Sequence, residues 1–162
     1  MQPKEGVIEL LNAALTTELT AINQYFLNAK MCGSWGFGRL EDRFRSLSFE
    51  EMRDTEELIA HILYLDALPN MQRLNQIHVG ENVPECLQAG LSLERGAVDF
   101  LRGAIEHCGR VGDYTTRAKF EQMIQDEERH VDWFETQLET IRLVGLERYL
   151  AQQISTAAGD AG

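Results

Sequence analysis

The sequence predicts an all-α protein, a four-helix bundle with a long crossover between helices two and three and a short fifth helix near the C-terminal end. Three observations favour this fold class. Hydrophobic residues make up 44% of the 162 residues, they recur at helical spacing over long segments, and the chain contains only three prolines. Because this length suffices for one buried core and no linker-like segment divides it, we expect a single domain over residues 1–162.

The first two helices are predicted over about residues 4–32 and 39–65. In the first helix, Leu11 and Leu15 recur at helical spacing, and the glycine-rich stretch 33–38 ends it. The segment ALPNMQRLNQIHVGENVP follows the second helix and is too long for a tight helical hairpin. Since prolines stand near both of its ends, we interpret this segment as the crossover.

The third and fourth helices are predicted over about residues 85–110 and 115–144, so that the bundle spans about residues 4–144. Only the short turn GRVGDY separates these two helices, and we expect them to be antiparallel neighbours. The sequence LERYLAQQI then predicts a short fifth helix over residues 146–154. The small residues of STAAGDAG, at 155–162, predict a flexible tail.

Composition narrows the class of protein. The chain has 15 Lys and Arg against 26 Asp and Glu, a net charge of −11, which argues against a nucleic-acid partner and is compatible with binding cations. The three cysteines, Cys32, Cys86 and Cys108, are too widely spaced to suggest a disulfide framework or a thiolate metal site. With no apolar signal core in MQPKEG and no run that could span a bilayer, we expect a cytoplasmic protein without membrane contact.

An internal repeat relates the two halves of the predicted bundle. A shift of 76 residues places Leu11 on Leu87 and Phe44 on Phe120. The same shift also relates ionisable residues on apolar helix faces: it pairs Glu18 with Glu94, Glu51 with Glu127, and Asp54 with His130. The two helix pairs therefore resemble copies of one another.

The paired acids occupy positions where a packed bundle would place apolar residues. Glu18, for example, lies three residues after Leu15 and four before Ile22, and the other members of the set have similar apolar neighbours. Burying such carboxylates without partners costs several kcal/mol each, and no Lys or Arg stands at the inward positions. A pair of divalent cations would compensate the charge. Carboxylates with one imidazole and no thiolate suit iron or manganese, with zinc possible.

Longer motifs resemble the bacterioferritin family, within the ferritin-like proteins. They are ELTAINQYFLNAKM at 18–31, EEMRD at 50–54, LYLDALPN at 63–70, DEERHVDW at 126–133 and GLERYL at 145–150. The resemblance implies a ferritin-like bundle that assembles into a hollow 24-mer, oxidises Fe(II) at a di-iron site inside each subunit and stores ferric mineral. It also implies b-type haem between paired subunits and a ferredoxin-type reductant for iron release.

The resemblance also implies roles for individual residues. Glu18 and Glu94 would be terminal iron ligands, Glu51 and Glu127 bridging ligands, His130 an imidazole ligand, and Met52 the axial ligand of haem. The family has a second histidine where this chain has Asp54, whose carboxylate reaches about as far. With Asp54, five carboxylates carry −5 against +4 for two ferrous ions, so we expect tight retention of Fe(III) or slow turnover.

Other positions leave alternatives open. At an inner-surface iron site that the resemblance implies, Ser46 replaces a histidine and Glu50 keeps the acid, so this site is expected to be weakened. Glu50 and Glu57 are expected to face the outside, or the cavity of a cage, rather than the di-iron site. Tyr25 and Trp133 are either electron donors or core aromatics. His61, His78 and His107 are assigned surface or packing roles.

Two other functions are compatible with these residues. The chain could be a haem-binding, ferroxidase-impaired subunit that co-assembles with a second bacterioferritin subunit. A different di-metal oxidase on the same bundle is the third possibility, disfavoured because no cysteine-based rubredoxin-like segment is present. The oxidant, O2 or peroxide, is left open.

Overall fold

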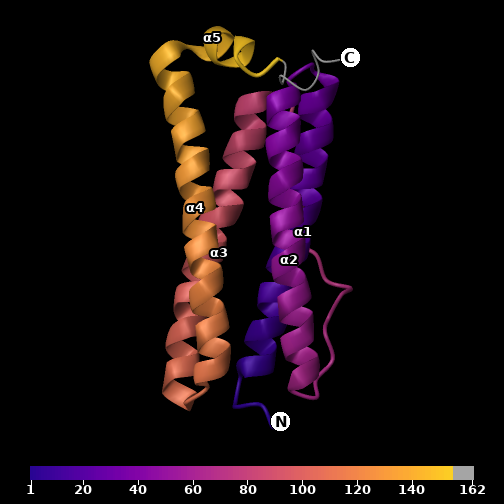
Figure 1. The fold of residues 1–162 in the computed structure, drawn as a ribbon, viewed down its shortest axis with the longest axis vertical. Helices are drawn as coiled ribbons and strands as arrows, with labels where there is room; N and C mark the ends of the chain where they lie inside the picture. Colours follow the sequence, from indigo (N-terminus) through magenta and orange to yellow (C-terminus); the bar gives the residue numbers. More distant parts are fainter. Residues whose placement is uncertain (155–162) are drawn as a thin grey trace.

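The computed structural model describes residues 1–154, and this part of the chain is helical without strands. The helices are α1 (Val7–Ser34), α2 (Gly38–Tyr64), α3 (Val83–Val111), α4 (Tyr114–Val144) and α5 (Leu146–Ala151). Helices α1 and α2 form one antiparallel hairpin, α3 and α4 form the other, and the hairpins meet mainly through α1 and α3 (Figure 1). The predicted four-helix bundle, with its crossover and short fifth helix, is confirmed.

The crossover, residues 65–82, runs along the outside of the α1–α2 hairpin (Figure 1). Polar side chains of α1 hold it. Thr20 Oγ1 accepts a hydrogen bond from the backbone N–H of Asn75 at 3.0 Å. Gln24 accepts from the N–H of His78 at 2.9 Å and donates to its carbonyl oxygen at 2.8 Å. These bonds satisfy backbone groups that have no helix or sheet partner, and so fix the path of the crossover.

Two helix starts differ from the sequence prediction. Helix α1 begins at Val7 because Gly6 has a left-handed conformation, with φ of 74°, that interrupts the helix before it. Helix α3 begins at Val83, because the side chain of Asn82 accepts a hydrogen bond from the N–H of Glu85 at 3.0 Å. Pro84 therefore lies in the first turn of α3, where its missing N–H costs nothing, rather than at the end of the crossover.

Helix α5 is shorter than predicted, ending at Ala151 instead of residue 154. The carbonyl oxygen of Gln153 accepts a hydrogen bond from the backbone N–H of Arg39 at 3.1 Å, which draws the chain toward the start of α2. This tertiary contact replaces further helical turns. The predicted flexible tail, residues 155–162, lies outside the described residues.

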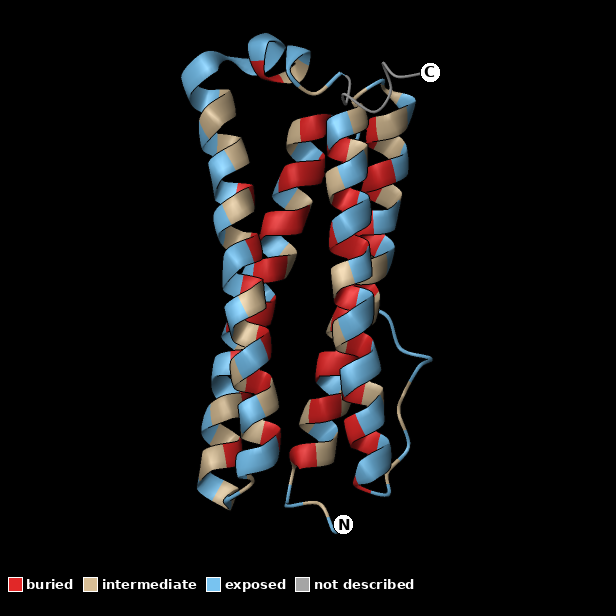
Figure 2. Ribbon diagram, viewed as in Figure 1, coloured by how far each residue is buried: buried red, intermediate tan, exposed pale blue. Residues whose placement is uncertain are grey.

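The core consists of two apolar clusters, one at each end of the bundle. Buried residues lie along the inner faces of the helices, and the outer faces are exposed (Figure 2). The α5-end cluster includes Tyr25, Phe44, Leu87, Phe134 and Tyr149. The opposite-end cluster includes Leu11, Leu58, Leu101, Phe120 and Met123. The buried thiols of Cys32 and Cys86 belong to the first cluster, and that of Cys108 to the second.

The 76-residue repeat has a structural counterpart in these clusters. Leu11 lies in the opposite-end cluster, whereas its repeat partner Leu87 lies in the α5-end cluster. Phe44 and Phe120 are divided between the clusters in the same way. Equivalent residues at opposite ends indicate that an approximate two-fold rotation relates the two hairpins.

Among the described residues, no helix is both long enough and apolar enough to cross a membrane.

One glycine contact provides a test of how tightly α3 and α4 pack within their hairpin. A Cβ atom at Gly90 would lie 2.3 Å from Cζ of Phe134, while one at Gly103, on the same helix, would have no neighbour within 4 Å. We expect Gly90→Ala to lower the free energy of unfolding by about 1–2 kcal/mol, because overpacking outweighs the better helix propensity of alanine. Gly103→Ala should instead raise it by up to about 1 kcal/mol.

Guanidinium unfolding, followed by circular dichroism, measures the free energy of unfolding of both variants. Equal midpoints for the two alanine variants would show that Gly90 is not a close-packing position.

Candidate metal centre

The ionisable residues singled out in the sequence lie between the two apolar clusters, on all four long helices. Five are almost fully buried, with exposed fractions of 4% or less, and they are Glu18, Glu51, Glu94, Glu127 and His130. Asp54 is half-buried. Each helix crosses from one apolar cluster to the other at its acid: on α1, Leu15 belongs to the opposite-end cluster and Ala21 to the α5-end cluster, with Glu18 between them.

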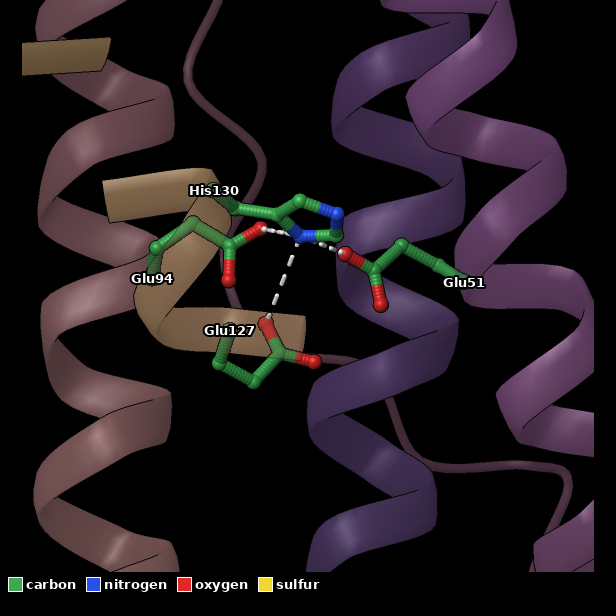
Figure 3. Close-up of side chains that lie close together, drawn as sticks. All are labelled: Glu51, Glu94, Glu127 and His130. Carbon is green, nitrogen blue, oxygen red and sulfur yellow. Dashed lines mark hydrogen bonds and ion pairs between the residues drawn. The ribbon is translucent and has the colours of Figure 1, made fainter. Parts of the chain in front are cut away.

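The imidazole of His130 lies at the middle of three carboxylates (Figure 3). Its Nδ1 atom is 3.0 Å from Oε1 of Glu51, 3.3 Å from Oε1 of Glu94 and 3.7 Å from Oε2 of Glu127. These residues come from α2, α3 and α4. One ring nitrogen and three carboxylates thus converge on a single point inside the bundle.

The donor atoms form two overlapping groups, each with its atoms within 4.8 Å of one another. The first group is Glu51, Glu94, Glu127 and His130, and the second is Glu18, Glu51, Asp54 and Glu127. The 76-residue shift converts one group into the other, because it exchanges Glu51 with Glu127. Two adjacent cation positions that share two carboxylates are the arrangement of a bridged di-metal site.

The carboxylates lack the partners that buried acids need. Five of their oxygen atoms are buried without a hydrogen bond: Oε2 of Glu18, both oxygens of Glu51, Oε2 of Glu94 and Oε1 of Glu127. Buried polar atoms without partners cost free energy, and charged ones cost most. All five belong to residues of the two donor groups, so these residues fit a pair of bound cations.

The metal-free centre retains protons in place of cations. Burial, reinforced by the negative charges of Glu51 and Glu127, raises the pKa of both Glu18 and Glu94 well above the usual range. Burial and then the charge of Glu51 raise the pKa of Asp54 to about 7. These shifts follow from acids held close together in a dry interior.

Glu51 and His130 form the ionised pair within this group. Burial opposes ionisation of Glu51, but the neighbouring Glu18 carboxyl group and His130 imidazole outweigh it and lower the pKa of Glu51. Burial likewise opposes protonation of His130, yet the carboxyl groups of Glu127, Glu51 and Glu94 around it raise its pKa.

Tyr25 contributes to the centre as well as to the core. Its ring is fully buried against Phe134, with the ring centroids 5.8 Å apart, so its packing role is clear. Its hydroxyl also donates a hydrogen bond to Oε1 of Glu94. Burial and the charge of Glu94 raise the pKa of Tyr25, which keeps that proton on the phenol.

Glu50 was expected to face away from the centre, and this prediction is wrong. Its Oε2 atom lies 2.7 Å from Nε2 of His130, and its Oε1 atom lies 3.3 Å from Nη1 of Arg43. The signal for this position is its spacing: residue 50 precedes Asp54 by four, so both lie on one side of α2. Glu57, in contrast, is exposed and pairs with Lys119 at 3.4 Å.

Other singled-out residues lie away from the centre. Met52 points outward, with 42% of its surface exposed. His61 is buried against the Thr116 hydroxyl, with Nε2 and Oγ1 2.8 Å apart, and His107 bonds the carbonyl oxygen of Glu5 at 2.7 Å. These contacts agree with the packing roles assigned to both histidines.

A cavity of about 450 Å³ leads from the surface to one side of the centre. Asp54 and His130 contribute to its wall, so both metal groups border it. The other lining residues are Arg43, Glu50, Arg53, Asp126 and Arg129. Through this cavity, solvent and ions can reach a centre that is otherwise buried.

Comparisons with known proteins give the family. The chain matches the ferritin-like domain over residues 8–144. It is 47% identical over 155 residues to a bacterioferritin of Mycobacterium avium, and the matched residues make up 96% of this chain and 98% of that protein. It is 46% identical over 160 residues to a bacterioferritin of Streptomyces coelicolor, with 99% and 96% covered. Similarity of this extent, over nearly the whole of each protein, shows that the chain belongs to the bacterioferritin family.

Proposed function

We propose that this chain is an iron-storage subunit that oxidises Fe(II) to Fe(III) at the centre between its two hairpins. Membership of the bacterioferritin family supports iron storage. The observation that carries the oxidation step is the sharing of Glu51 and Glu127 by both donor groups, since such sharing holds two ions close enough to react together.

Each ligand then has a role. Glu51 and Glu127 would be shared by the two ions, Glu18 and Asp54 would complete one position, and Glu94 and His130 would complete the other. A bound pair of ferrous ions would supply two electrons, which together with two protons would reduce O2 to hydrogen peroxide or hydrogen peroxide to water. The chain holds the ions together and supplies compensating negative charge in a dry interior. The oxidised iron is the material that would be stored.

Asp54 makes this centre more negative than one with two imidazoles. The five carboxylates sum to −5, against +4 for two ferrous ions and +6 for two ferric ions. The extra negative charge favours the ferric state, because attraction grows with the charge of the ion. We therefore propose that the centre retains Fe(III) tightly and turns over slowly.

Haem binding between paired subunits is the second part of the proposal. Met52 presents a thioether on the outer face of α2, and Phe49, three residues earlier, is 50% exposed on the same side. A soft sulfur ligand beside an aromatic ring suits b-type haem. Two Met52 residues from two-fold related subunits would then ligate one haem iron, and such dimers would build a 24-subunit cage in the cytoplasm.

A second candidate function follows from the one difference between the two donor groups. Asp54 stands where the repeat would place the counterpart of His130. If the chain turns over too slowly to support storage alone, it would act as the haem-bearing subunit of a mixed cage, beside a catalytically faster bacterioferritin subunit. A ferredoxin-type protein is the proposed reductant for iron release.

The first prediction concerns iron oxidation. With two Fe(II) per subunit loaded without oxygen and then mixed with O2 or peroxide, native protein should show a rise in ferric absorbance. Glu127→Ala should slow iron oxidation by at least about 100-fold. Losing a residue that only orients a metal ligand lowers activity by about 10–100-fold, and losing a ligand itself costs more. Glu57→Gln, at an exposed acid, is the matched control.

The same assay with Asp54→His separates the two candidate functions. A ferroxidase that retains Fe(III) would oxidise the first iron rapidly, and its activity toward a second addition of iron would then recover about tenfold more slowly than that of Asp54→His. This tenfold ratio of rates corresponds to a difference of roughly 1.4 kcal/mol in activation free energy. If only Asp54→His oxidises iron rapidly, the subunit belongs to a mixed cage. Equal rates of recovery in both proteins would contradict the proposed effect of charge.

Haem binding has a simple test. Met52→Leu preserves the size of the side chain but removes the sulfur, so the protein reconstituted with haem should lose its Met-ligated absorbance spectrum while its iron oxidation persists. Phe100→Leu, at a half-buried aromatic on another helix, serves as a control and should leave the spectrum unchanged. An unaltered spectrum in Met52→Leu would remove this residue as the ligand.

The protonated acids give a pH prediction for metal-free protein. The pKa values of Asp54, Glu18 and Glu94 are raised on folding, and so is that of His130. The folded chain thus binds more protons than the unfolded chain between about pH 5 and about pH 8, and its free energy of unfolding should fall as pH rises. Glu51, with a lowered pKa, acts in the opposite sense only at more acidic pH.

Urea unfolding at several pH values, with and without Co(II), measures this slope. Bound metal displaces the protons and should flatten or reverse the trend. A midpoint that rises with pH in metal-free protein would contradict the expectation.

A further inference from the structure

The two ring nitrogens of His130 have different partners. Nδ1 faces the acids of the centre, whereas Nε2 lies 2.7 Å from Oε2 of Glu50. A carboxylate accepts hydrogen bonds and cannot donate them, so the Nε2 atom must be the donor in this contact. A neutral imidazole has one N–H, and with that N–H at Nε2 the lone pair of Nδ1 is directed at the metal position.

Glu50 is itself held in place. Its second oxygen, Oε1, lies 3.3 Å from Nη1 of Arg43, which is seven residues earlier on the same face of α2. The Arg43 guanidinium lies over the ring of Trp133, 5.2 Å from the centroid, and Trp133 follows His130 by three residues on α4. The four side chains form a continuous link from α2 to α4, with Glu50 at its centre.

The internal repeat offers a comparison within the same molecule. The shift of 76 residues relates Glu50 to Asp126 and Arg43 to Lys119. The counterpart of the contact between Glu50 and His130 would join Asp126 to Asp54, which has no imidazole to orient. Asp126 instead pairs with Arg129 on its own helix, and Lys119 pairs with Glu57. The contact therefore occurs on the side of the centre that has the histidine.

We propose that Glu50 is a positioning residue, which fixes the ring orientation and tautomer of His130 so that Nδ1 is presented to the metal ion. Glu50 belongs to neither donor group, and both of its oxygens already have partners. Carboxylates that accept from the distal nitrogen of a ligating histidine are a general device for this purpose. The inference rests on the proposed di-metal function of the centre.

Anaerobic titration of the assembled protein with Co(II), followed by visible absorbance, tests this role. Native protein should bind two Co(II) per subunit. Glu50→Ala should lower the affinity for one of the two Co(II) ions by about 10–100-fold and leave the affinity for the other unchanged. Glu50→Gln retains an oxygen that accepts from Nε2–H and should restore most of the affinity. Glu57→Ala, at an exposed acid of the same helix, should match native protein.

Three results would overturn the positioning role while the di-metal function stands. In the first, Glu50→Ala binds both Co(II) ions with native affinity. In the second, its affinity for both ions falls equally. In the third, native protein binds a third Co(II) that only Glu50→Ala loses, which would make Glu50 a ligand. Failure of native protein to bind two Co(II) would instead remove the centre itself, and both proposals with it. Unfolding midpoints of the metal-free variants distinguish a general loss of stability from a change at one ion.

Discussion

The burial of four glutamate side chains in the middle of a helical bundle, with Asp54 half-buried beside them, is the constraint on which the rest of the structure depends. Carboxylates in a dry interior repel one another unless cations or protons lie between them. The bundle accommodates this layer by placing one apolar cluster on each side of it. These clusters contribute the hydrophobic stabilisation that offsets the cost of the acids, and they cover the centre on both sides along the bundle axis.

Much of the fold followed from periodicity in the sequence. Apolar residues at helical spacing gave four long helices, and the length of the intervening segment gave the crossover. The ends of the helices were less accurate, because they depend on single contacts. Asn82 caps α3, which therefore starts two residues before the predicted start, and a hydrogen bond between Gln153 and Arg39 stops α5 early. Neither contact has a periodic signal.

The centre was predictable to a similar degree. A helical wheel gives the direction in which a side chain leaves its helix, and that was sufficient to bring Glu18, Glu51, Glu94 and Glu127 together. It does not give how far a side chain can bend back, which is why the contact of Glu50 with His130 was missed. Nor does a set of carboxylates and one imidazole distinguish iron from manganese or zinc, because all three accept such ligands. The family relationship supplies the preference for iron.

Each donor group contains residues from both hairpins, and this has a mechanical consequence. Glu51 belongs to the first hairpin and Glu127 to the second, and neither hairpin alone could complete either cation position. An ion pair bound there would be a removable cross-link across the plane where the hairpins meet, a plane otherwise held mainly by α1 against α3. The supply of metal would then set how rigidly the two hairpins are held together.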